Sequence, residues 1–131
     1  ILLCNDADGK FTLPSINVNS NGATEGDNDF NNLNNIGASF HFFVETAATD
    51  MDIKTDGTDK FKGSILISVD DGTIKGFVPG ASNDVITMNG STKGGIAGSI
   101  VSFTAIDTAT YMVHNSLLIG SGTIVTPYAD A

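Results

Sequence analysis

Apolar and polar residues alternate with a period of two along most of the chain. In residues 50–55, Met51 and Ile53 fall on one side of an extended backbone and the charged residues fall on the other. In residues 38–45, Phe42 and Phe43 fall on opposite faces, which predicts a strand that is central or covered on both sides. This period is typical of half-buried β-strands. No window of eleven or more residues shows a helical period with caps, so we expect an all-β protein.

The most β-prone part of the chain is the stretch 94–125. Residues 99–105 are rich in Ile, Val, Phe and Thr, which favour a pleated, half-buried surface. A turn-prone DTAT sequence at 107–110 leads to further short strands at 111–113, 117–119 and 123–125. Strands joined by short turns form a β-meander, which needs a second sheet to cover its apolar face.

The N-terminal part is predicted to begin with two short strands at 1–4 and 10–13. The connector NDADG at 5–9 has the residue types of a tight hairpin or a bulged turn. Residues 15–37 are dominated by Asn, Asp, Gly and Ser, and we interpret them as a long surface loop held by Phe30 and Leu33.

The clearest hairpin lies at 64–78, where two β-prone runs flank Asp70-Asp71-Gly72. With 131 residues and turn signals throughout, the chain is predicted to fold as one domain, 1–131. The fold class is all-β: a β-sandwich or an open β-barrel, jelly-roll-like or β-tulip-like, of about eight to ten short strands with long polar loops.

The predicted core follows from the inward positions of these strands. It consists of Phe40, Phe42, Val44, Ile53, Ile65, Ile67, Val69, Phe77, Ile86, Ile100, Phe103 and Ile124.

Charge and cysteine content exclude several classes of function. Fifteen acidic residues stand against six basic ones, every basic residue is Lys, and the net charge is −9. Such a chain repels a phosphate backbone, so we expect no nucleic-acid partner. Cys4 is the only cysteine, which excludes an intrachain disulfide and a cysteine-based zinc site. No apolar run is long enough to span a membrane, so we expect no membrane partner.

Several short motifs suggest chemistry, but each has a simpler interpretation. Asp6-x-Asp8-Gly9 resembles half of a calcium loop without its remaining ligands, and Asn89-Gly90-Ser91 is both a glycosylation sequon and a turn sequence. The two histidines, His41 and His114, have no evident third metal ligand. No serine lies in a nucleophile elbow. We therefore expect no enzyme activity, no catalytic residue, no cofactor and no metal.

One ordered series of segments resembles a known class of proteins. The series runs DG at 8–9, FTLPS at 11–15, GASFHFFV at 37–44, ATD at 48–50, DKFKG at 59–63, DVITMNG at 84–90, GG at 94–95, GSIV at 98–101, YMV at 111–113, GSG at 120–122 and TPY at 126–128. In order and spacing it is similar to small β-rich virion structural proteins of tailed, marine-type bacteriophages, in particular capsid decoration (cement) proteins.

The resemblance implies a subunit, made in the host cytoplasm, that binds the major capsid protein on the capsid exterior and stabilises the head. It also implies self-association, as a homotrimer. We expect partner contacts at Ile1, Leu2, Leu3, Phe30, Leu33 and Tyr128. Two alternatives stay open: a β-sandwich subunit of an extracellular filament, in which residues 1–4 complete a neighbour's sheet, and a glycan-binding module.

Overall fold

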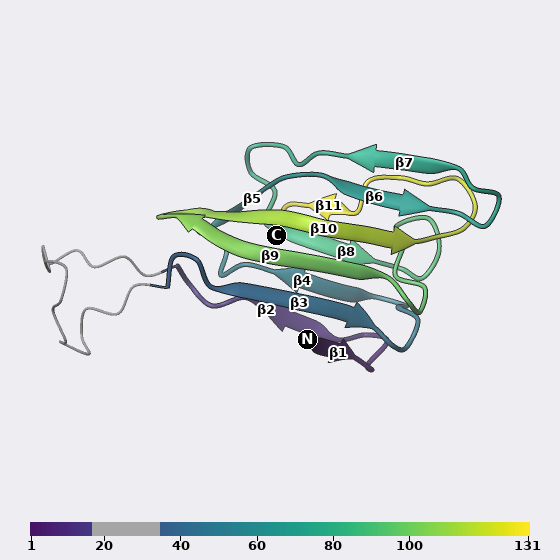
Figure 1. Ribbon diagram of the computed structural model, residues 1–131, viewed down its shortest axis with the longest axis horizontal. Helices are drawn as coiled ribbons and strands as arrows, with labels where there is room; N and C mark the ends of the chain where they lie inside the picture. The colour runs from purple at the N-terminus through teal and green to yellow at the C-terminus, as the bar shows by residue number, and fades with distance from the viewer. Residues whose placement is uncertain (17–34) are drawn as a thin grey trace, which may run out of the picture.

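A computed structural model describes residues 1–16 and 35–131, which form eleven β-strands in two sheets and contain no helix (Figure 1). The all-β prediction is confirmed, with one strand more than the expected range. The strands are β1 (Leu2–Cys4), β2 (Lys10–Thr12), β3 (Ser39–Val44), β4 (Met51–Lys54), β5 (Lys60–Lys62), β6 (Ile65–Ser68), β7 (Ile74–Phe77), β8 (Val85–Met88), β9 (Ile100–Asp107), β10 (Thr110–Ile119) and β11 (Tyr128–Ala129).

The larger sheet has seven strands in the order β1-β3-β9-β10-β6-β7, with β5 also paired to β10. Both β5 and β6 run parallel to β10, β5 along its first residues and β6 along its last. They are two pieces of one edge along β10, interrupted at Gly63-Ser64. Gly63 has a φ of 116° and passes so close to Val113 that a Cβ would overlap the Val113 carbonyl oxygen. Only glycine fits this position without strain.

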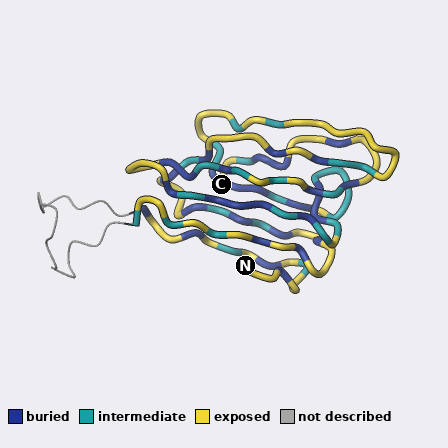
Figure 2. The backbone as a smooth tube through the Cα atoms, in the orientation of Figure 1, coloured by how far each residue is buried: buried dark blue, intermediate teal, exposed yellow. Residues whose placement is uncertain are grey.

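The smaller sheet has four strands in the order β11-β8-β4-β2, and its inner face packs against the larger sheet as a β-sandwich. Aromatic rings connect the two layers: Phe11 on β2 and Phe42 on β3 lie 5.6 Å apart between ring centroids. Within the described residues the two sheets stay open at their edges, so they do not form a closed barrel. Buried positions follow the middle of both layers (Figure 2).

Most of the predicted core is confirmed. Eight of the predicted residues are buried: Phe42, Val44, Ile53, Ile65, Ile67, Ile86, Phe103 and Ile124. Phe40, Val69 and Phe77 are partly buried against the same cluster. The prediction that Ile100 belongs to the core is wrong, because the register places Ile100 opposite Phe43 on the outer face. Met51, which alternation placed inward beside Ile53, is buried as well, whereas the prediction missed the buried Phe61, Met88 and Tyr111.

The centre of the larger sheet is the β9–β10 hairpin, whose turn at 107–110 is confirmed. The predicted meander of short strands at 111–113, 117–119 and 123–125 is wrong. Residues 110–119 form one strand with a bulge after His114, where Asn115 takes a φ of 48°. Residues 123–125 are not a strand, and the partners of β10 other than β9 are the parallel β5 and β6. The positive φ of Asn115 is a left-handed conformation, which Asn tolerates better than most residues.

The β6–β7 hairpin is confirmed. The Val69 amide donates to the Thr73 carbonyl, the Gly72 amide donates to the Val69 carbonyl, and Gly72 has a φ of 84°. This is a three-residue loop closed by a glycine in the left-handed region.

The predicted N-terminal hairpin is wrong. β1 runs parallel to β3 in the larger sheet, whereas β2 runs parallel to β4 in the smaller sheet. The connector 5–9 therefore crosses between the layers. β3 is central, between β1 and β9, but its outer face is open, since Phe43 is 37% exposed. Most of the predicted polar loop, with Phe30 and Leu33, lies outside the described residues.

Candidate interaction surface

The outer face of the seven-stranded sheet carries an unbroken apolar row. The strand registers place its members side by side across six strands: Leu3, Phe43, Ile100, Leu117, Leu66 and Gly76. Exposed fractions are 57% for Leu3, 41% for Leu117 and 42% for Leu66. A contiguous row of this kind is more informative than scattered apolar residues, because isolated exposed side chains are common on any protein.

Beside this apolar row lies a second row, the polar row, made of hydrogen-bonded side chains: Ser39, His41, Ser102, Thr104 and His114. His41 Nδ1 lies 2.8 Å from Ser102 Oγ, and His114 Nε2 lies 2.8 Å from Thr104 Oγ1. Ser39 Oγ lies 2.7 Å from the same Thr104 hydroxyl. The imidazoles of the two histidines meet edge to face, 6.2 Å apart between centroids. These bonds hold both rings in fixed positions over β9, so the polar row is rigid.

The sequence reasoning did not expect the two histidines to meet. The register does bring them together: His41 and His114 both lie opposite Ser102, on either side of β9. Within the described ranges, no group of three or more His, Cys, Asp or Glu side chains is arranged to hold a metal ion. The two histidines contribute hydrogen bonds to Ser102 and Thr104 on this surface.

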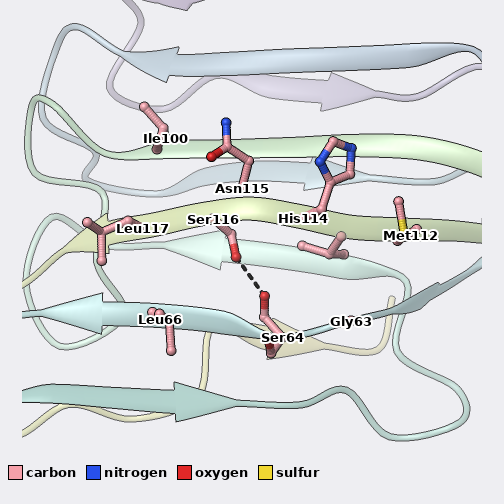
Figure 3. A pocket seen from close by; sticks show the side chains of 10 residues that line it. Gly63, Ser64, Leu66, Ile100, Met112, His114, Asn115, Ser116 and Leu117 are labelled. Atoms are coloured by element: carbon pink, nitrogen blue, oxygen red, sulfur yellow. Dashed lines mark hydrogen bonds between the residues drawn. The ribbon is translucent and has the colours of Figure 1, made fainter.

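A shallow hollow of about 620 Å³ opens at the bulge in β10 (Figure 3). Leu66, Ile100 and Leu117 of the apolar row line it, together with Asn115. The Ser116 hydroxyl donates to the Ser64 carbonyl at 2.6 Å and bridges the gap where β5 gives way to β6. The hollow is thus a local depression in the apolar row, of a size that accepts a side chain of a partner.

Charge distinguishes the two outer faces of the sandwich. No residue of the apolar row or of the polar row is acidic, in a chain with a net charge of −9. The outer face of the smaller sheet is charged instead: Lys10 Nζ lies 3.0 Å from carboxylate oxygens of both Asp50 and Asp52. The two rows hold no carboxylate that would lose its hydration when the face is covered, so the larger sheet offers the better docking face.

The other predicted contact residues take different positions. Ile1 and Leu2 are exposed at the edge of the larger sheet, 91% and 46%. Tyr128 is buried between the layers, and its hydroxyl donates to the Gly63 carbonyl at 2.9 Å. It leaves little surface for a partner.

The motifs with possible chemistry act as turns in the structure. Asp6 Oδ1 accepts from the Asp8 amide, and Asn89 Oδ1 accepts from the amides of Ser91 and Lys93. Cys4 is fully buried, and this burial raises the pKa of its thiol to about 11. The thiol therefore stays protonated at neutral pH and is a poor nucleophile.

Two buried aspartates bind backbone amides outside the strands: Asp84 binds the Ala131 amide and Asp59 binds the Ile16 amide. Asp84 receives Lys60 Nζ at 2.6 Å and the Ala131 amide at 2.9 Å. Burial alone would raise the pKa of Asp84, but these donors hold it below its usual range. Among the described residues, the Asp59 carboxylate accepts only from the Ile16 amide, at 3.0 Å, and burial outweighs this bond and raises the pKa of Asp59. The ion pair of Asp84 with Lys60 thus stabilises the folded protein, whereas the ionised form of Asp59 destabilises it.

We expect the substitution Asp59→Asn to stabilise the protein at pH 7. Because the folded-state pKa of Asp59 is raised, its ionised form costs stability above that pKa, and the cost disappears below the ordinary aspartate pKa. The difference in unfolding free energy between Asn variant and wild type should therefore grow as the pH rises through this window. Urea denaturation at a series of pH values measures it.

Asp71→Asn is the control, because a hydrogen bond from Thr73 lowers the pKa of Asp71 and its neutralisation should cost stability at pH 7. A loss for Asp59→Asn that is the same at every pH would contradict the expectation. It would mean that the bond to Ile16 outweighs the burial of the charge.

No helix of the described part is long and apolar enough to cross a membrane. Comparison of the chain with protein-family models, with curated proteins and with solved structures finds no significant match.

Proposed function

We propose that this chain is a virion structural protein, a decoration subunit that binds the exterior of a tailed-phage capsid and reinforces it. The apolar row on the outer face of the larger sheet carries this proposal. It crosses six strands, lacks acidic residues, and lies beside the rigid polar row. The ordered series of segments that resembles phage decoration proteins supplies the identity of the partner.

The proposed binding step is the burial of the apolar row against the major capsid protein. Fully burying one Leu or Phe side chain contributes about 1.5–3 kcal/mol. The row carries five such side chains, part of whose area is exposed, so it can supply a large share of the binding free energy. The hollow at the β10 bulge provides a place for a side chain of the capsid to anchor.

The test needs the major capsid protein, which can be identified from the genes next to the one that encodes this chain. A major capsid protein encoded next to this chain would be assembled into capsids and mixed with the purified chain, and binding would be measured by co-sedimentation. We expect saturable binding at a fixed ratio to the capsid protein. A chain that stays in the supernatant at all concentrations would contradict the proposal and favour a filament subunit or a glycan-binding module.

The double variant Phe43→Ser, Leu117→Ser tests the surface. Each substitution removes one buried apolar contact, so we expect at least about a tenfold weaker binding to the capsid per site. Both side chains are exposed in the subunit alone, so the thermal midpoint should change little. Lys54→Ser, on the outer face of the smaller sheet, is the matched control and should bind like the wild type. Equal binding by all variants would contradict the role of this face.

A further inference from the structure

The two edges of the seven-stranded sheet run in opposite directions. β1 is parallel to β3, β3 and β10 are each antiparallel to β9, β6 is parallel to β10, and β7 is antiparallel to β6. β1 and β7 are therefore antiparallel to each other, and no described segment pairs with the outer side of either strand (Figure 1). Two copies placed side by side in the same orientation would bring β1 of one next to β7 of the other, as an antiparallel pair.

The backbone groups of the two edges alternate in matching phase. The Cys4 carbonyl accepts from the amides of Glu45 and Thr46, so the polar groups of Cys4 point into the sheet and those of Leu3 point out of it. On β7, the Val69–Thr73 bond closes the hairpin, and by the same alternation Gly76 presents its amide and carbonyl to the open edge. Leu3 and Gly76 lie in one row of the sheet, so they can form a hydrogen-bonded pair.

We propose that β1 of one subunit pairs with β7 of a second copy of this chain, with Leu3 opposite Gly76, and that this contact assembles the subunits head to tail. The inference rests on the proposed function, because it assigns the self-contact of the decoration subunit. The same register pairs Ile1 with Val78 and Leu2 with Phe77.

The side chains at the two edges are complementary in this register. Ile1 is 91% exposed and Val78 is 75% exposed, and the pairing covers each with the other. Gly76 leaves a gap between Ile74 and Val78 on the outer face. Leu3 fills that gap, in reach of both neighbours along the diagonals of the pair.

The charges at the edges permit this contact. Residues 1–4 carry no charged side chain, and Lys75 is the one charged residue of β7. Lys75 would lie opposite Cys4, close to the acidic loop that contains Asp6. The acidic hairpin tip, Asp70-Asp71, lies outside the paired residues. Since each subunit also carries a net charge of −9, added salt should strengthen the association.

The length of the contact determines how it is used. A paired stretch of four residues is about 13 Å long, and an interface of that length is smaller than a stable dimer needs. Each subunit, however, offers both edges. A head-to-tail contact closes into a ring such as a trimer if the rotation between neighbours allows it, and forms an open filament otherwise. A ring gains a further contact for each closure, which compensates for the weakness of one contact.

The test uses two variants that block one edge each. Leu3→Pro removes an amide that points out of β1, and Ile74→Pro does the same on β7, so neither substitution removes a bond within the sheet. Each full-length variant is studied alone and in a 1:1 mixture with the other by sedimentation velocity. If either proline variant fails to fold by circular dichroism, Leu3→Lys and Ile74→Lys replace the pair. Deletion of residues 1–4 is less suitable, because it also removes buried Cys4.

We expect the wild type to assemble with increasing concentration, each blocked variant to stay monomeric, and the mixture to form a dimer, because one open edge of each kind remains. A wild type that stays monomeric at millimolar concentration would overturn the inference. A mixture that stays monomeric would overturn it as well. So would an Ile74→Pro variant that dimerises by itself, since its β1 is still open and this is the result for an interface of β1 with β1. In both cases intact binding to capsids would leave the proposed function standing.

Discussion

Replacing Phe103 by Ala is expected to lower the free energy of unfolding by about 3–5 kcal/mol. Phe103 is fully buried on β9, at the centre of the sandwich. Its ring meets Phe42 edge to face at 5.7 Å and lies 5.2 Å from the ring of Phe61. The substitution would leave a cavity bordered by both rings, and neither can fill it, because each is also packed against its own strand neighbours. Guanidinium denaturation monitored by far-UV circular dichroism measures the loss.

Phe43→Ala is the matched control. Phe43 has the same side chain on the adjacent strand of the same sheet, but it faces outward and is 37% exposed. Its loss should cost much less than that of Phe103. Equal costs for the two variants would show that the assignment of inner and outer faces is wrong.

Replacing Gly63 by Ala is expected to lower the free energy of unfolding by about 2–5 kcal/mol, through backbone strain together with overpacking. The position has a φ of 116°, which side chains avoid, and the new methyl group would overlap the Val113 carbonyl oxygen. The backbone cannot shift easily, because the Gly63 carbonyl also accepts the Tyr128 hydroxyl across the sandwich. Thermal unfolding of the variant gives the size of the effect.

Gly57→Ala separates the two causes. Gly57 has a φ of 95°, but an added Cβ there would meet nothing within 4 Å. It should therefore show only the strain of the left-handed conformation, about 1–2 kcal/mol. If Gly63→Ala were no worse than Gly57→Ala, the close approach of β10 to the β5–β6 junction would be contradicted.

The sequence predicts the strands of this fold better than their pairing. Alternation placed Met51, Ile53 and Phe42 inward, because a period of two is a local property of an extended chain. The parallel pairs of β1 with β3 and of β6 with β10 join residues far apart in the chain, and no local signal specifies them. The hairpin expected at the N-terminus failed for this reason: its connector has turn residues, but these residues also suit a crossing between two layers.

The interaction surface could be predicted only in part. Partner contacts were expected at Ile1, Leu2 and Leu3, because an apolar strand without a partner would otherwise face water. The apolar row was not expected, because its members come from six strands and meet only through the registers. Tyr128, also expected at a partner contact, has its ring in the core of the subunit.

The central position of the β9–β10 hairpin has a consequence for how the chain folds during its synthesis. The strands on both sides of this hairpin, β3 and the β6–β7 pair, leave the ribosome before it. At roughly 5–20 residues per second, the apolar inner face of β3 waits on the order of several seconds for β9. During that time the early strands can pair with each other or with neighbouring chains, and long-range pairing of this kind is slow in any case. The yield of native subunits should therefore depend on translation rate and on chaperones more strongly than the stability of the finished sandwich would indicate.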